Sequence, residues 1–212
     1  MYRLEPTQPS QIKDIGICHL KCFPSSFSSK LGLKYINKSF EWFLTNENRF
    51  LFHIECDNKV VGYCGGFRSS YHGDGSTSGM LQYAMPEAIK GIIRRPYLLF
   101  HPEFVKRYPL VLKNIWRRIY KSRKSIPSIN NYNSNDAKIG LVVIGVLPEY
   151  RGKGCFELLM QQFEKESKNR KAEKITLSVK ATNARAIAAY KKAGFQIATQ
   201  TRKGVEMFKV IV

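Results

Sequence analysis

The sequence predicts one α+β domain of 212 residues, with a mixed sheet of about seven mostly antiparallel strands and helices on both faces. A chain of this length, 43% hydrophobic, can bury a core of its own. Short apolar or alternating runs bounded by turn residues predict the strands. The expected strands cover residues 1–5, 50–56, 60–68, 141–146, 174–179, 195–199 and 205–211.

Apolar residues at helical spacing predict the helices that connect these strands. The expected helices cover residues 9–22, 27–44, 86–93, 102–120 and 183–193, and a further one follows Gly154. Residues 71–79 contain three glycines and predict a mobile loop. His19 faces the core side of its helix, where a packing role is expected.

The chain is organised around a strand, a glycine-rich turn and a helix start. Leu141–Val146 is apolar and β-branched, as in a buried strand, and Arg151-Gly152-Lys153-Gly154 follows it. The first N–H groups of a helix have no partner within the helix, and its dipole adds positive charge there. Glycines allow close approach of the backbone, and Arg and Lys add formal charge. These features predict a site for a pyrophosphate.

The turn alone does not identify the ligand, because it matches neither the nucleoside-triphosphate loop nor the three-glycine dinucleotide motif. A second motif follows at residues 183–195. The chain contains V-x-P-x-Y-R-G-x-G at 146–154 and N-x-x-A-x-x-x-Y-x-x-x-G-F at 183–195. In these two motifs the sequence resembles the GNAT superfamily of N-acetyltransferases. The resemblance covers the C-terminal third closely, and the rest of the chain only by the order of its elements.

The resemblance implies an acyl-CoA N-acyltransferase fold, with the sheet splayed beside the strand that ends at Val146. It implies acetyl-CoA as cosubstrate, with the pyrophosphate on the 151–156 turn and the pantetheine arm along the preceding strand. The cofactor-binding residues expected on this basis are Ile144, Gly145, Val146, Arg151, Gly152, Lys153, Gly154, Cys155, Phe156, Asn183 and Tyr190. No metal is expected.

Acetyl transfer requires an aligned amine, a route for its proton and stabilisation of the oxyanion. We expect Tyr190 to be the catalytic acid for the leaving thiolate, since phenol and thiol have comparable basicity. A buried core role for Tyr190 and an N-cap role for Asn183 are the alternatives. The general base is not identified, and the remaining candidates are Asp136, Glu87, Glu103, His72 and Asp74.

Residues 85–136 form an insertion relative to the minimal acetyltransferase plan. Between Lys90 and Lys124 there are eleven Lys or Arg and one acid, interleaved with aromatic residues. Such a segment packs on the core, lies on an anionic membrane, or shapes a pocket for a phosphate-bearing acceptor. The net charge of +19 favours anionic partners in general.

Five scattered cysteines argue against a disulfide framework, and the N-terminus lacks the apolar core of a signal peptide. We therefore expect a cytoplasmic protein. Cys18 and Cys22 lie one helical turn apart, where buried thiols are expected rather than a metal pair.

The sequence favours an N-acetyltransferase that acts by direct attack in a ternary complex on a small, anionic primary amine, such as a nucleotide-linked amino sugar. A protein or peptide amine is the alternative acceptor. A basic membrane-surface or nucleic-acid binding module on an acyltransferase fold is the alternative class, with nucleic acid disfavoured because no known module for it is present. The sequence is also compatible with a homodimer.

Overall fold

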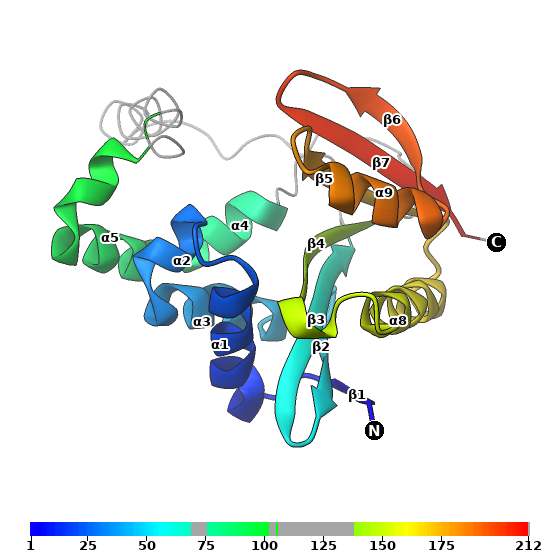
Figure 1. The fold of residues 1–212 in the computed structure, drawn as a ribbon, viewed down its shortest axis with the longest axis horizontal. Helices are drawn as coiled ribbons and strands as arrows, with labels where there is room; N and C mark the ends of the chain where they lie inside the picture. The colour runs from blue at the N-terminus through cyan, green and yellow to red at the C-terminus, as the bar shows by residue number, and fades with distance from the viewer. Residues whose placement is uncertain (69–75, 102–104, 106–137, 212) are drawn as a thin grey trace, which may run out of the picture.

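The computed structural model describes residues 1–68, 76–101, 105 and 138–211 (Figure 1). Its strands are β1 Arg3–Pro6, β2 Arg49–Cys56, β3 Lys59–Arg68, β4 Lys138–Val146, β5 Lys174–Lys180, β6 Gln196–Gln200 and β7 Gly204–Val210. Its α-helices are α1 Ile12–Cys22, α2 Phe27–Leu31, α3 Leu33–Glu41, α4 Ser76–Tyr83, α5 Met85–Arg94, α8 Cys155–Asn169 and α9 Ala184–Lys192. Short 3-10 helices are η1 Pro9–Gln11, η2 Trp42–Leu44, η3 Pro96–Phe100 and η4 Pro148–Tyr150.

The seven strands form one sheet in the order β1-β2-β3-β4-β5-β7-β6. All neighbouring strands are antiparallel except β4 and β5, which run parallel. The predicted mixed, mostly antiparallel sheet is therefore confirmed. All seven strands predicted from the sequence are present.

Helices cover both faces of this sheet. The α1 and α3 helices pack together, and α1 contacts β3 and β4, whereas α8 covers β2, β3 and β4. The glycines of β3 show the two faces: a Cβ at Gly66 would meet the Phe163 ring of α8 at 2.6 Å, and one at Gly65 would meet Phe43 at 3.0 Å. Buried apolar side chains from both layers form a single core.

The helix expected over residues 27–44 is divided into α2, α3 and η2. Gly32, at φ +100°, separates the first two helices, because this conformation favours glycine and interrupts the helical hydrogen bonds. The loop expected over residues 71–79 is also partly wrong, since α4 begins at Ser76. Residues 71–75 of that loop, all but residue 105 of the helix expected over 102–120, and most of the 85–136 insertion lie outside the described residues.

Among the described residues, no helix is both long enough and apolar enough to cross a membrane.

Candidate active site

The sheet opens between β4 and β5. These strands pair only at Lys138–Lys174, Ile139–Ile175 and Gly140–Thr176, while β3 follows β4 as far as Val146. Beyond Gly140 the two strands diverge, and the β5, β7 and β6 strands turn away from β4 (Figure 1). The open edge of β4 therefore runs from Leu141 to Val146.

The backbone polar groups along this open edge can be assigned from the β3–β4 ladder. Leu147 N–H donates to Val61 O at 2.9 Å, which makes these two residues a hydrogen-bonded pair. Residues of an antiparallel strand alternate between the two sides. The N–H groups of Val146 and Ile144 therefore point away from β3, into the gap that β5 has left. They are placed to polarise a carbonyl group in this gap.

The glycine turn supplies a second set of backbone donors. Gly152 and Gly154 have φ values of +74° and +81°, which favour glycine. No side chain caps the N-terminus of α8, and its first backbone bond runs from Leu158 N–H to Gly154 O at 3.0 Å. The N–H groups of the first helical turn thus have no acceptor within the helix, and they face outward as an anion site requires.

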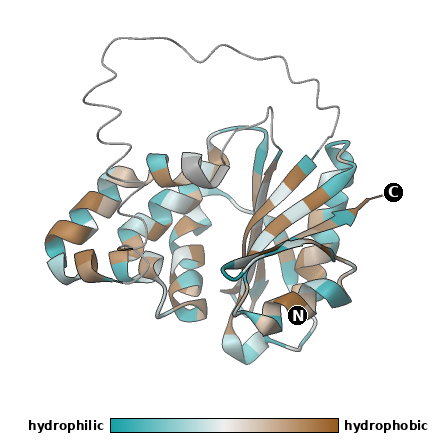
Figure 2. Cartoon of the chain, turned by 90° about the horizontal axis from the view of Figure 1, so that it is seen from above, coloured by the Kyte–Doolittle hydropathy of each residue, from teal (hydrophilic) through white to brown (hydrophobic). Residues whose placement is uncertain are grey.

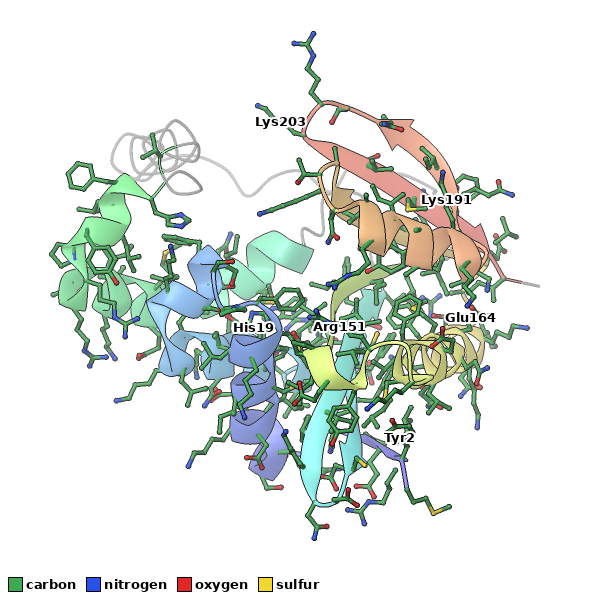
Figure 3. All side chains as sticks on the ribbon, in the orientation of Figure 1. Tyr2, His19, Arg151, Glu164, Lys191 and Lys203 are labelled. Atoms are coloured by element: carbon green, nitrogen blue, oxygen red, sulfur yellow. The ribbon has the colours of Figure 1, made fainter. Side chains whose placement is uncertain are left out.

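Arg151 holds this turn against the N-terminal helices. Its Nε donates to Val146 O at 3.1 Å, and its Nη2 lies 3.5 Å from Cys22 O at the end of α1. Figure 3 shows Arg151 at the start of α8, on the side that faces α1. Cofactor binding by Arg151 stays a prediction, and in this structure its guanidinium bonds to two backbone carbonyls. Its observed role is to position the turn.

Lys153 is the exposed cation of the turn, with Nζ 5.6 Å from the centre of the Tyr150 ring. The Cys155 side chain is fully buried, so only its backbone N–H remains for a ligand. Of the two cations expected to bind a pyrophosphate, Lys153 is the more exposed, and the binding role of both stays a prediction.

Tyr190 lies between α8 and the core. Its ring centroid is 5.9 Å from that of Phe156 and 5.7 Å from that of Phe195. Burial, and to a lesser degree the neighbouring Cys64, raises the pKa of Tyr190 above its usual value. The hydroxyl makes no hydrogen bond to any residue that the structure describes. It therefore stays protonated and is free to donate.

Asn183 is the N-cap of α9, where its Oδ1 accepts from Ala186 N–H at 3.2 Å. The predicted capping role is confirmed. The side chain is exposed, and its Nδ2 makes no bond within the described part of the chain. One end of the amide therefore fixes the helix, while the other end remains available for a ligand.

A polar chain on the other face of β4 was not predicted. His19 Nδ1 lies 2.6 Å from the Tyr63 hydroxyl, and its Nε2 lies 3.4 Å from Ser28 Oγ. The Tyr63 hydroxyl is pressed against Gly145, where a Cβ would approach it to 2.6 Å. Burial lowers the pKa of His19 to about 4, so the imidazole is neutral at physiological pH. The packing role expected for His19 is present, because its ring also contacts Phe40.

Of the candidate general bases, only Glu87 lies in the described part of the chain. Asp136, Glu103, His72 and Asp74 lie outside the described residues. Glu87 belongs to α5, where it pairs with Lys90 at 2.6 Å.

One group in the described part of the chain has the composition of a metal site. The ligand atoms of Glu5, His53 and Glu55 lie within 4.8 Å of one another on β1 and β2. Arg3 pairs with both carboxylates, and the buried His53 also contacts Thr7. These contacts explain the cluster as a charge network at the sheet edge.

Comparison with known proteins agrees with this geometry. Residues 128–195, which include both sequence motifs, match the model of the Acetyltransferase (GNAT) family. This chain carries the GNAT fold. The fold predicted from the sequence is thus confirmed, and the match over residues 128–195 agrees with the family resemblance of the two motifs. No curated protein matches the chain by sequence.

Several solved structures share this GNAT fold at low sequence identity. A ribosomal-protein-alanine N-acetyltransferase from Escherichia coli is 16% identical, with a TM-score of 0.53 over 100% of this chain and 94% of that one. PaiA N-acetyltransferase from Thermoplasma acidophilum, solved with coenzyme A, is 12% identical, with a TM-score of 0.57 over 99% of each chain. NAA60 from Arabidopsis thaliana, solved with acetyl-CoA, is 12% identical, with a TM-score of 0.59 over 100% and 99%.

Proposed function

We propose that this protein transfers an acetyl group from acetyl-CoA to the primary amine of a small anionic acceptor, by direct attack in a ternary complex. The observation that carries the proposal is the open edge of β4 beside the uncapped start of α8. One segment thus offers donors for a thioester carbonyl and, a few residues later, donors for a pyrophosphate. The coenzyme in two structures of similar fold, from Thermoplasma acidophilum and Arabidopsis thaliana, supports the same ligand here.

In this mechanism each group has a separate task. One N–H group of this edge, that of Ile144 or of Val146, stabilises the oxyanion that forms when the amine attacks the thioester carbonyl, because the two lie about 6.8 Å apart along the strand. Tyr190, held protonated by its burial, donates a proton to the departing CoA thiolate. The proton that the amine loses passes to water, and the tyrosinate is protonated again from water, so the step balances. The turn from Arg151 to Phe156 fixes the pyrophosphate, which holds the thioester in line with the amine.

The anionic acceptor is supported by charge. At +19 the chain attracts anions and disfavours the protonated form of a nearby amine, since like charges lower the pKa of an ammonium group. A nucleotide-linked amino sugar combines negative charge with an amine. A protein or peptide N-terminus is the alternative acceptor.

Titration calorimetry with acetyl-CoA tests the cofactor, using one glycine variant in the turn and one between α2 and α3. Gly154→Ala and Gly32→Ala each place a side chain at positive φ, and neither Cβ meets a protein atom within 4 Å. Gly154→Ala, at φ 81° and ψ −7°, should cost about 1–2 kcal/mol of stability, and Gly32→Ala, at φ 100° and ψ 169°, should cost more, because that region is nearly restricted to glycine. Only Gly154→Ala should weaken acetyl-CoA binding. Equal affinities in the two variants, or no binding by the wild type, would contradict the proposed site.

A screen of thiol release from acetyl-CoA tests the acceptor. Nucleotide-linked amino sugars should outperform neutral amino sugars, polyamines and peptides, and added salt should reduce the advantage. A preference for peptides would refute the anionic small acceptor while leaving acetyl transfer intact.

A further inference from the structure

A row of exposed apolar side chains runs along α5 and η3. We call Met85, Ile89, Ile93, Tyr97 and Phe100 the α5 stripe; their exposed fractions are 47%, 51%, 73%, 63% and 81%. Of the twelve large apolar residues that are exposed in the described part of the chain, six lie between Met85 and Val105. In Figure 2, hydrophobic segments are visible in the helices at this end of the molecule. Such a concentration indicates an interaction surface.

The stripe is not the result of a loosely attached helix. The opposite side of α5 is packed: Ala84 is fully buried, and Gly91 approaches α2 so closely that a Cβ would lie 2.8 Å from Leu31 O. Arg95 also donates to Lys30 O at 2.6 Å. The helix is therefore fixed by one apolar face while it presents a second one outward.

A positively charged hollow of about 350 Å³ lies on the other flank of α5, between this helix and α3. Its lining residues are Lys34, Asn37, Lys38, Glu41, Glu87, Lys90 and Arg94. Its two carboxylates are neutralised, Glu41 by Lys38 at 2.7 Å and Glu87 by Lys90 at 2.6 Å. Lys34 and Arg94 have no ion pair with any residue in the described ranges. The hollow thus carries two surplus positive charges.

We propose that the α5 stripe and this hollow dock onto a lipid bilayer that contains anionic phospholipids. Charge complementarity selects this partner, because Arg94 and Lys34, on the flank of α5 beyond the stripe, have long side chains that extend toward phosphate headgroups. The ten residues of α5 span about 15 Å, roughly half of a bilayer's hydrocarbon core, so the helix lies along the interface with its stripe facing inward. The α5 helix lies at the end of the molecule away from α8, which leaves the cleft accessible (Figure 1).

Vesicle flotation with the full chain tests this surface. Wild-type protein should float with phosphatidylcholine vesicles that contain phosphatidylserine, and much less with phosphatidylcholine alone. Ile89→Gln combined with Ile93→Gln should reduce flotation at least tenfold, because two buried side chains are lost. The matched control, Leu158→Gln with Ile197→Gln, changes two exposed residues elsewhere and should float like the wild type.

The charge contribution is tested separately. Arg94→Gln should weaken binding to phosphatidylserine vesicles about fivefold, whereas Arg202→Gln, the same change in the β6–β7 turn, should not. Thermal unfolding should show all variants folded, since each altered side chain is exposed. No flotation of the wild type, or undiminished flotation of the Ile89 and Ile93 variant, would overturn the proposal. So would a wild-type oligomer in light scattering that dissociates in that variant, because the stripe would then join two copies.

Discussion

Replacing Arg151 by Lys keeps the positive charge of the turn but removes the guanidinium that spans two carbonyls. The loss of the 3.1 Å bond to Val146 O should cost about 1–2 kcal/mol, because a hydrogen bond from a charged group contributes about 1.5–3 kcal/mol and Lys recovers part of it. The 3.5 Å contact with Cys22 O adds little. For a domain of this size, the melting temperature should fall by about 3–6 °C.

The same variant should bind acetyl-CoA about tenfold more weakly, because a turn that is no longer fixed must be ordered on binding, at about 1.4 kcal/mol per factor of ten. Calorimetry and thermal unfolding measure the two effects. Lys153→Met is the comparison: it removes an exposed charge, so it should weaken binding in a salt-dependent way and leave the melting temperature unchanged. An unchanged melting temperature in Arg151→Lys would refute the positioning role that we assign to Arg151.

Three further predictions concern residues around β4. Tyr190→Phe should lower kcat by about 10²-fold or more through loss of the general acid, with the melting temperature and the KM for acetyl-CoA unchanged. If stability falls together with the rate, Tyr190 has a structural role instead. Burial depresses the pKa of His19 to about 4, so below pH 6.5 the unfolded chain binds more protons than the folded chain. The contribution of neutral His19 to the free energy of unfolding is therefore complete above pH 6.5 and is lost as the pH falls toward 4. Urea unfolding should register a loss of about 2–3 kcal/mol between pH 7 and 4.5 in the wild type, and His19→Gln should flatten that slope. Gly145→Ala should destabilise the protein by about 1–3 kcal/mol in the same assay, since its Cβ would approach the fully buried Tyr63 to 2.6 Å; neutral behaviour would mean that Tyr63 does not lie across β4.

Local sequence patterns predicted the parts of the site that depend on short segments. The strand ending at Val146, the glycine turn and the following helix form one continuous stretch, so periodicity and backbone requirements are visible together. Asn183 was predicted as an N-cap for the same reason, because its partner Ala186 is three residues away. All seven strands followed from apolar runs bounded by turn residues.

The remaining features depend on contacts between distant residues. The bond from Arg151 to Cys22 O spans 129 positions, and the His19–Tyr63 pair spans 44. No local sequence pattern distinguishes an arginine that binds a ligand from one that donates a hydrogen bond to a backbone carbonyl of another helix. The close approach of Tyr63 to Gly145 becomes visible only once β3 and β4 are paired.

The short pairing between β4 and β5 affects the rigidity of the sheet. In the described part of the chain, only the pairing of residues 138–140 with residues 174–176 joins the two parts of the sheet, β1–β4 and β5–β7. A cosubstrate bound in the gap would contact both parts of the sheet and would connect β4 to β5 where the two strands do not pair. Occupancy should therefore stiffen the whole sheet and slow amide exchange in β5 as much as in β4.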